Sequence, residues 1–267
     1  MQTLPYWHVD AFADRPFTGN QAAVIPLETW LPDEVLQAIG GENNFAETAF
    51  VVPDSKGEAD WELRWFTPTS EVAMCGHATL ASGHVLLTRD GGERVTFRTR
   101  RAGVLEVRRA ESGYELALPV TRVAPCANPA LLAALGAEGE CFDSISGAEQ
   151  TAIILLEDEA AVRALAPDMR ALRNIDVMAI CTAPGVRTDV VSRVFVPAWG
   201  IDEDPVTGSA HAALTPFWAE RLGRDSFTAH QASARGGDIG CRLEGERAWL
   251  SGNCVTVVEG RFFLPGE

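Results

Sequence analysis

The stretch that decides the fold is residues 75–81, CGHATLA, where a loop enters an apolar helix through Gly76. Residues 207–211, TGSAH, repeat this arrangement, and Gly208 lies 132 positions after Gly76. Two other landmarks recur in the same order at nearly the same offset: FTP and AETAFVVP in the first half match FVP and VMAICTAP in the second. Chance is the alternative, because FxP tripeptides and glycines before helices are common. The shared order predicts a duplicated domain of about 130 residues.

Short strands are expected to dominate both halves. Runs rich in Val, Ile, Phe and Thr, bounded by Gly, Pro or Asp, predict strands over 7–12, 22–26, 48–52, 62–66, 95–99, 103–107, 114–118, 152–156, 177–181, 190–196, 241–243 and 256–258. Helical periodicity predicts helices over 32–39, 77–88, 158–165 and 209–222. The predicted fold class is therefore α+β.

The domain boundary is expected in the Pro-rich segment 119–129. This predicts a first domain of residues 1–118, to which the C-terminal strand 258–267 is added, and a second domain of residues 119–257. A site that uses both halves would lie in the cleft between them.

Composition excludes several classes of function. The 267 residues carry a formal net charge of −15, which argues against nucleic-acid and anionic-membrane partners. No run of 18 apolar residues and no signal-peptide pattern is present, and the six cysteines are scattered. These features predict a cytoplasmic protein with reduced thiols.

No cofactor and no metal are expected. The chain lacks the GxxxxGK[ST], GxGxxG, HExxH and GxSxG motifs. Its single lysine, Lys56, lies in the turn at residues 54–58, whereas a pyridoxal Schiff base needs a buried lysine.

Glu47 is the first candidate catalytic residue, because a carboxylate at the mouth of an apolar strand is unusual. Desolvation would raise its pKa towards neutrality and suit it to proton transfer. Its counterpart in the second half is Met178, so one copy alone carries the acid. The alternative is a surface glutamate at a strand end.

The two glycine-helix junctions are candidate anion sites. First-turn N–H groups of a helix have no partner inside the helix, and the helix dipole favours negative charge there. Plain N-capping by Thr207 or Ser209 is the alternative. His77 follows Gly76 and can transfer a proton or serve as a capping or core histidine. Asp204 can orient His77 or a substrate amine, or simply complement the helix dipole.

These motifs together resemble the PhzF family, the phenazine-biosynthesis-type isomerases with the diaminopimelate epimerase fold. The matching segments cover almost the whole chain: 9–12, 19–24 (GNQAAV), 44–50 (NFAETAF), 64–68, 71–72, 75–81, 204–210 (DPVTGSA) and 251–252.

The resemblance implies two similar domains, each a barrel-like, mostly antiparallel sheet around a central helix. It implies that Glu47, His77 and Asp204 are catalytic, and that Asn20, Gly76, Gly208 and Ser209 bind substrate. Glu47 would take a proton from one carbon and return it to another without a cofactor. The implied partners are a small carboxylated, amino-acid-like or cyclic substrate and a second copy of the chain in a homodimer.

One departure from the wider fold separates the remaining alternatives. Diaminopimelate epimerases use one cysteine per domain as opposed acid and base. Cys75 occupies the first such position, but Pro205-Val206 stands at the second, which argues against a two-thiol racemase. We interpret Cys75 as a remnant in the pocket wall. An epimerase with another base, and a non-catalytic binding protein on the same fold, stay open alternatives.

Overall fold

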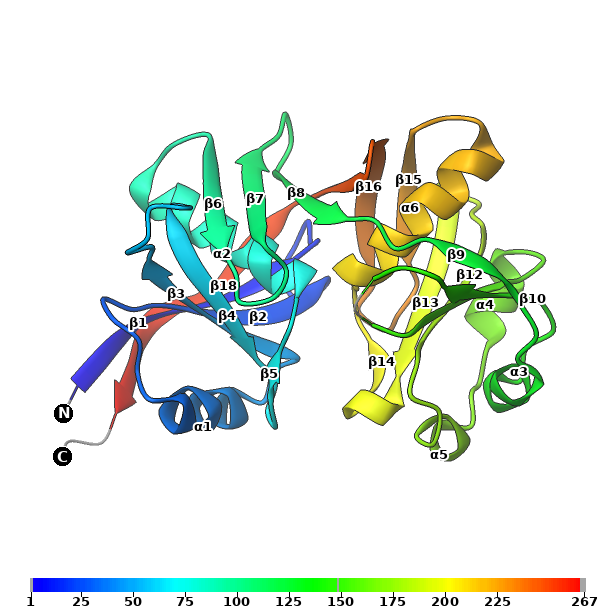
Figure 1. Cartoon of the computed structure of the whole chain (residues 1–267), viewed down its shortest axis with the longest axis horizontal. Coiled ribbons are helices and arrows are strands. Elements are labelled where there is room, and N and C mark those ends of the chain that lie inside the picture. The colour runs from blue at the N-terminus through cyan, green and yellow to red at the C-terminus, as the bar shows by residue number, and fades with distance from the viewer. Residues whose placement is uncertain (1, 148, 265–267) are drawn as a thin grey trace. The chain divides into compact units, whose positions relative to one another are not determined.

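The computed structural model describes residues 2–147 and 149–264, and within them the chain forms two compact units. Unit 1 holds the residues up to Ala117 and those from Ser251 onward, and unit 2 is Leu118–Leu250. Strands dominate and helices are few, as expected for an α+β chain (Figure 1). No helix among the described residues is long and apolar enough to cross a membrane.

Unit 1 contains two substantial helices among its strands. Its elements are β1 (Gln2–Ala11), β2 (Asn20–Pro26), α1 (Asp33–Asn43), β3 (Glu47–Pro53), β4 (Trp61–Phe66), β5 (Glu71–Val72), α2 (Gly76–Asp90), β6 (Arg94–Arg98), β7 (Val104–Arg109), β8 (Tyr114–Pro119) and β18 (Cys254–Leu264).

Among its described residues, unit 2 repeats this plan with three short helices and one helix that is as long as α2. Its elements are β9 (Val123–Cys126), α3 (Pro129–Leu135), β10 (Glu140–Ser144), β11 (Thr151–Leu155), α4 (Glu159–Ala164), α5 (Met169–Leu172), β12 (Met178–Pro184), β13 (Val190–Val196), the 3-10 turn η1 (Pro197–Trp199), β14 (Ile201–Asp204), α6 (Gly208–Leu222), β15 (Ser226–Gln231), β16 (Gly237–Glu244) and β17 (Arg247–Gly252).

The strand pairings of the two units match one for one. In unit 1, β2–β3 and β4–β6 pair in parallel, whereas β1–β2, β3–β4 and β6–β7 are antiparallel. In unit 2, β11–β12 and β13–β15 pair in parallel, whereas β10–β11, β12–β13 and β15–β16 are antiparallel. The predicted duplication is therefore confirmed in the pairing pattern.

One pair of equivalent strands comes from different ends of the repeat: the strand lies at the C-terminus of the chain for unit 1 and at the start of the segment for unit 2. In unit 2, β9 pairs with β10, whereas its counterpart in unit 1 is β18, which pairs with β1. The blue β1 and the red β18 run side by side in Figure 1 and pair from Ala11 opposite Cys254 to Gln2 opposite Leu264, with a shift of register between His8 and Val9. The C-terminal part of unit 1 therefore begins at Ser251, earlier than the expected residue 258, because β18 pairs with β1 from Cys254 onward.

A buried helix lies at the centre of unit 1. Eleven of the fifteen residues of α2 are buried, and the helix contacts β1, β2, β3, β6, β7 and β18. Gly83 allows this approach: a Cβ there would lie 2.3 Å from the Val107 side chain of β7. The equivalent helix α6 is also mostly buried. The predicted sheet around a central helix is therefore what the structure contains.

A repeated ion pair stabilises the same strand in both units. The Arg64 guanidinium donates to both carboxylate oxygens of Glu71 at 2.8 and 2.9 Å, and Arg193 does the same with Glu203. Each guanidinium also lies 4.9 Å from the ring centroid of the phenylalanine two residues later. Bidentate pairs of this kind are the stronger arginine–carboxylate geometry, so the duplication kept a contact as well as a topology.

Several elements differ from the sequence-based expectation. The four helices expected at 32–39, 77–88, 158–165 and 209–222 are found as α1, α2, α4 and α6, with ends shifted by a few residues. The short strands β5, β9, β10, β14, β15 and β17 and the helices α3 and α5 were not expected. The strand β9 contains a proline, whereas the prolines of 119–129 indicate a linker from the sequence alone. A proline is tolerated in β9 because this strand pairs with one described strand of unit 2, β10.

We expect Gly83→Ala to destabilise the protein by about 2 kcal/mol, because the added methyl group overlaps Val107 and the helix cannot retreat from the strands around it. Gly41→Ala is the matched control: Gly41 is exposed in α1, with its nearest foreign atom 3.5 Å from an added Cβ. That change should stabilise by up to about 1 kcal/mol through helix propensity. Urea unfolding measures both, and equal effects of the two changes would contradict close packing of α2.

Candidate active site

Three element starts bring polar side chains together in unit 1. Asn20 opens β2, Glu47 opens β3 opposite Ala22 of β2, and Gly76 and His77 open α2. Because β2 and β3 are parallel, their first residues lie at the same edge of the sheet. The structure therefore joins four of the predicted site residues.

His77 is the centre of this cluster. Its Nδ1 lies 3.2 Å from Asn20 Nδ2, and its Nε2 lies 3.2 Å from Glu47 Oε2 and 3.3 Å from the Gln21 carbonyl oxygen. An amide nitrogen can only donate, so Nδ1 accepts and the ring proton is assigned to Nε2. The Nε2 proton is therefore donated to the Gln21 carbonyl oxygen, and the Glu47 carboxylate oxygen lies 3.2 Å from the same nitrogen.

Burial keeps this imidazole neutral. The His77 side chain is 4% exposed and the Glu47 side chain 15% exposed. Desolvation lowers the pKa of His77 to about 4, against a smaller opposing effect of the Gln21 carbonyl. At neutral pH, Glu47 thus faces an uncharged N–H donor and keeps partial access to solvent.

Cys75 is the third potential ligand in this cluster, but the three residues do not point at a common metal position. Its Sγ lies 3.5 Å from His77 Nδ1, whereas Glu47 contacts Nε2 on the other side of the ring. The possible ligand atoms of the three residues lie within 4.8 Å of one another, but the thiol lies near Nδ1 of His77 and the carboxylate near Nε2. The thiol and the carboxylate thus flank one imidazole on two sides, which suits proton transfer better than metal binding.

A second polar cluster surrounds the start of α6 in unit 2. The Thr207 hydroxyl donates to Asp204, which is buried. Gln231 of β15 accepts from the Thr207 amide at 2.8 Å and donates to the Asp204 carbonyl at 2.7 Å. His211 Nδ1 lies 2.8 Å from the Thr207 carbonyl oxygen. These bonds hold the loop before Gly208 in one conformation.

The two clusters are related by the duplication. Ser209 follows Gly208 as His77 follows Gly76, and Met178 opens β12 as Glu47 opens β3. Ser209 Oγ contacts Met178 Sδ at 3.7 Å, in the place of the contact between His77 and Glu47. Unit 2 therefore preserves the contact but not the acid, as the repeat predicted.

Plain N-capping does not explain these helix starts. The N-cap residues are Cys75 for α2 and Thr207 for α6, and neither side chain caps its helix. Thr207 instead donates to Asp204. The first-turn amides of α2 and α6 are thus not capped by the residue at the N-cap position.

Gln231 was missed by sequence reasoning. It is fully buried and lies 24 positions after Thr207 on a strand that was not expected. No local motif marks it, because its role follows from the pairing of β13 with β15. The role expected of Asp204 towards His77 or a substrate amine stays a prediction.

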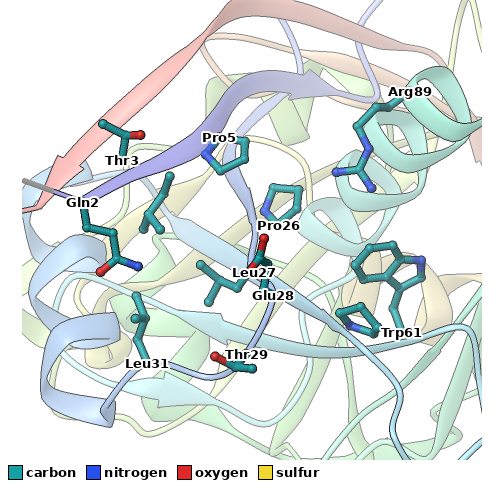
Figure 2. Close-up of a pocket in the computed structure, with 12 residues that line it drawn as sticks. Gln2, Thr3, Pro5, Pro26, Leu27, Glu28, Thr29, Leu31, Trp61 and Arg89 are labelled. Carbon is teal, nitrogen blue, oxygen red and sulfur yellow. The ribbon is translucent and has the colours of Figure 1, made fainter.

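The pocket of unit 1 in Figure 2 is separate from the Glu47 cluster. It measures about 510 Å³, and its lining includes Trp61 and Arg89, whose guanidinium carbon lies 5.6 Å from the indole centroid. Arg89 is near the end of α2, about 18 Å along the helix axis from His77 at 1.5 Å per residue. None of the predicted site residues lines this pocket.

Each unit thus wraps a helix in strands, and unit 1 places a carboxylate beside a neutral imidazole at the start of that helix. The model of the phenazine biosynthesis-like (PhzC-PhzF) family matches residues 9–260. The chain belongs to this family, which confirms the resemblance drawn from its motifs.

Individual relatives agree with this assignment. An uncharacterized isomerase of Pseudomonas aeruginosa is 48% identical over 265 residues, covering 98% of this chain and 99% of that protein. A PhzF family crystal structure from Enterococcus faecalis has a TM-score of 0.88 at 40% identity and covers 98% of this chain and all of that one. A hydroxyproline epimerase of Agrobacterium vitis, at 14% identity and a TM-score of 0.67 over 97% of this chain and 92% of its own, shares the fold.

We expect stability to fall as the pH drops from 6.5 to 4, because two histidines are buried in the neutral form. Burial lowers the pKa of His211, like that of His77, to about 4. The unfolded chain, with ordinary pKa values near 6.5, then binds more protons in this window, so stability rises with pH across it. Each histidine accounts for about 2 kcal/mol between pH 7 and 4.5.

His211→Asn should reduce that pH dependence by about 2 kcal/mol while keeping a donor near the Thr207 carbonyl. Urea unfolding at pH 7 and 4.5 measures the difference. Val191→Ala, a buried apolar change in the same unit, should lower stability equally at both pH values. An unchanged pH dependence in His211→Asn would show that His211 is not buried as a neutral group.

Proposed function

We propose that this protein is a cofactor-independent isomerase that moves a proton between two carbons of a small carboxylated substrate, with Glu47 as general acid and base. One observation carries the proposal: Glu47 Oε2 lies 3.2 Å from Nε2 of a buried, neutral imidazole at the start of α2. Family membership and the isomerase name of a 48% identical relative support the reaction class.

The first step is proton abstraction by Glu47. The carboxylate takes a proton from a substrate carbon, the C–H electron pair moves into the conjugated system of the substrate, and Glu47 becomes a neutral acid. The acid then delivers a proton to a different carbon, which restores the carboxylate. Because the Glu47 side chain is 15% exposed, the proton that it carries can exchange with solvent between the two steps. No electron is lost or gained, so the reaction needs no redox partner.

The neutral state of His77 lets Glu47 act both as a base and, once protonated, as an acid. An imidazolium at 3.2 Å would stabilise the Glu47 carboxylate and weaken it as a base. A neutral N–H orients the carboxylate with a smaller effect on its basicity, and Asn20 fixes which ring nitrogen carries the proton. The first turn of α2, beginning at Gly76 and not capped by the Cys75 side chain, adds amides and a helix dipole that stabilise negative charge on the substrate.

The unit 2 residues are proposed as substrate-binding groups. Gly208 and Ser209 open α6 with a hydroxyl and first-turn amides, which fit a carboxylate. Asp204, held by Thr207, is proposed to bind a substrate amine or assist transfer.

An epimerase is less well supported, because its chemistry needs two opposed bases. Thr207 precedes α6 as Cys75 precedes α2, so the residue equivalent to Cys75 is Thr207 and not the expected Pro205-Val206; the residue equivalent to Glu47 is Met178. A non-catalytic binding protein would have the same fold but no turnover. The exchange experiment below distinguishes it from an isomerase.

We expect Glu47→Gln to lower turnover by about 10²–10⁴-fold while leaving the fold intact, because the amide cannot accept the proton. Proton NMR in D₂O measures the change, with dihydro-hydroxyanthranilate and a panel of cyclic and linear amino acids as substrates. Deuterium should enter at carbon with the wild type and with Glu42→Gln, an exposed glutamate of α1. Undiminished exchange in Glu47→Gln would refute Glu47 as the base. Ligand-dependent thermal stabilisation without exchange for any substrate would favour the binding protein.

Asn20 is proposed as a positioning residue, and the isosteric change Asn20→Asp tests it. The carboxylate cannot donate to Nδ1, so it should move the ring proton to Nδ1 and raise the pKa of His77. We expect kcat to fall about 10–100-fold with little change in KM. Imidazole ¹⁵N NMR across pH reads the tautomer directly. An unchanged tautomer together with a fallen kcat would show that Asn20 acts in another way.

A further inference from the structure

Two free thiols face each other across neighbouring strands of unit 2. Cys126 ends β9 and is directly opposite Cys141 of β10 in the antiparallel register. Their sulfur atoms lie 2.8 Å apart. Cys141 is buried and Cys126 is partly exposed, so a small reagent can reach one member of the pair.

The spacing fits a disulfide better than a metal site. Directly opposed residues of antiparallel strands have Cα atoms about 4.5–5.5 Å apart, within the range of about 4.4–6.8 Å that a disulfide spans. Two thiolates on a tetrahedral zinc ion, each about 2.3 Å from the metal, stand roughly 3.8 Å apart. The sulfurs would have to separate to bind zinc, whereas they only have to approach to bond.

Asp143 lies beside the two sulfurs. It is two residues after Cys141, so its side chain projects from the same face of β10. Its Oδ1 is buried and has no hydrogen-bond partner among the described residues. Burial, with smaller effects of Cys141 and Asp143, raises the pKa of Cys126 to about 12. The carboxylate therefore disfavours the thiolate form and slows reaction at neutral pH.

We propose that Cys126 and Cys141 form a redox site that closes to a disulfide by exchange with a low-molecular-weight disulfide such as oxidised glutathione. The Cys126 thiolate, having lost its proton to solvent, attacks one sulfur of glutathione disulfide and releases one glutathione thiolate. The Cys141 thiolate then attacks the Cys126 sulfur and releases the second. Two thiols are oxidised, one disulfide is reduced, and two glutathione molecules leave with the two protons. The site is independent of the proposed isomerase chemistry.

The bond would close a loop that contains α3. This helix packs Leu131 and Leu135 into the core of unit 2, and β9 is paired with β10 alone among the described strands of that unit. Closing the loop restricts the unfolded chain, so the oxidised protein should be the more heat-stable form.

The test is thiol counting on the full chain after incubation with oxidised glutathione. Denaturing alkylation and intact mass should show two fewer adducts than the six of the reduced protein, and peptide mapping should find Cys126 joined to Cys141. Tm should rise by about 5 °C or more and return on reduction with dithiothreitol. Cys126→Ser should abolish the change, whereas Cys254→Ser, at a partly exposed cysteine of unit 1, should leave it intact.

Three outcomes would overturn the proposal. Six adducts after oxidation would show that the pair does not react, and a lasting glutathione adduct on Cys126 would show that Cys141 cannot resolve it. Protection of both thiols by added Zn²⁺ alone, reversed by a chelator and without the disulfide mass loss of about 2 Da, would make the cluster a metal site.

Asp143→Asn tests the part assigned to the carboxylate. Removing the negative charge should lower the pKa of Cys126 and raise its thiolate fraction. Exchange should then speed up about threefold for each unit by which the pKa falls, because nucleophilicity falls partly in step with pKa. The rate in both proteins should rise with pH. An unchanged rate in Asp143→Asn would show that the carboxylate does not control the pair.

Discussion

The burial of one helix inside the strands of unit 1 is the constraint on which the candidate site depends. Because α2 is wrapped by strands, its first turn has a single position, and the side chain of His77 is removed from water. That burial sets the charge of the imidazole, and Asn20 sets its tautomer. A helix at the surface would have left the same histidine hydrated, titrating near its ordinary pKa.

Duplication supplied two such helices, and divergence at their starts made the units unequal. The strand pairings and the arginine–glutamate contacts were retained, since they hold the sheet together. The paired positions at the starts of the strand and the helix hold Glu47 and His77 in unit 1 but Met178 and Ser209 in unit 2, and each pair is in contact. Packing limits substitution in a core more than at a helix start. At a helix start, a different side chain changes the chemistry while the fold stays the same.

The parts of the prediction that succeeded rest on local pattern and residue order. The four helices with clear apolar periodicity were found close to their expected bounds, and the repeat was visible from three landmarks. The strands that were missed are short, carry polar or proline residues, and are stabilised by neighbours distant in sequence, as β9 is by β10. Gln231 was missed for the same reason, because its partners Asp204 and Thr207 lie on another segment.

The sequence by itself determined the strand-rich class, the duplication, the family and the identity of Glu47 and His77 as candidates, because motifs and their order are properties of the chain. Only the tertiary structure decided that His77 is neutral and lies against Glu47, that β18 pairs with β1 from Cys254 onward, and that Cys126 faces Cys141. Desolvation and strand register are set by atoms far apart in the sequence, so these properties arise only when the chain is folded.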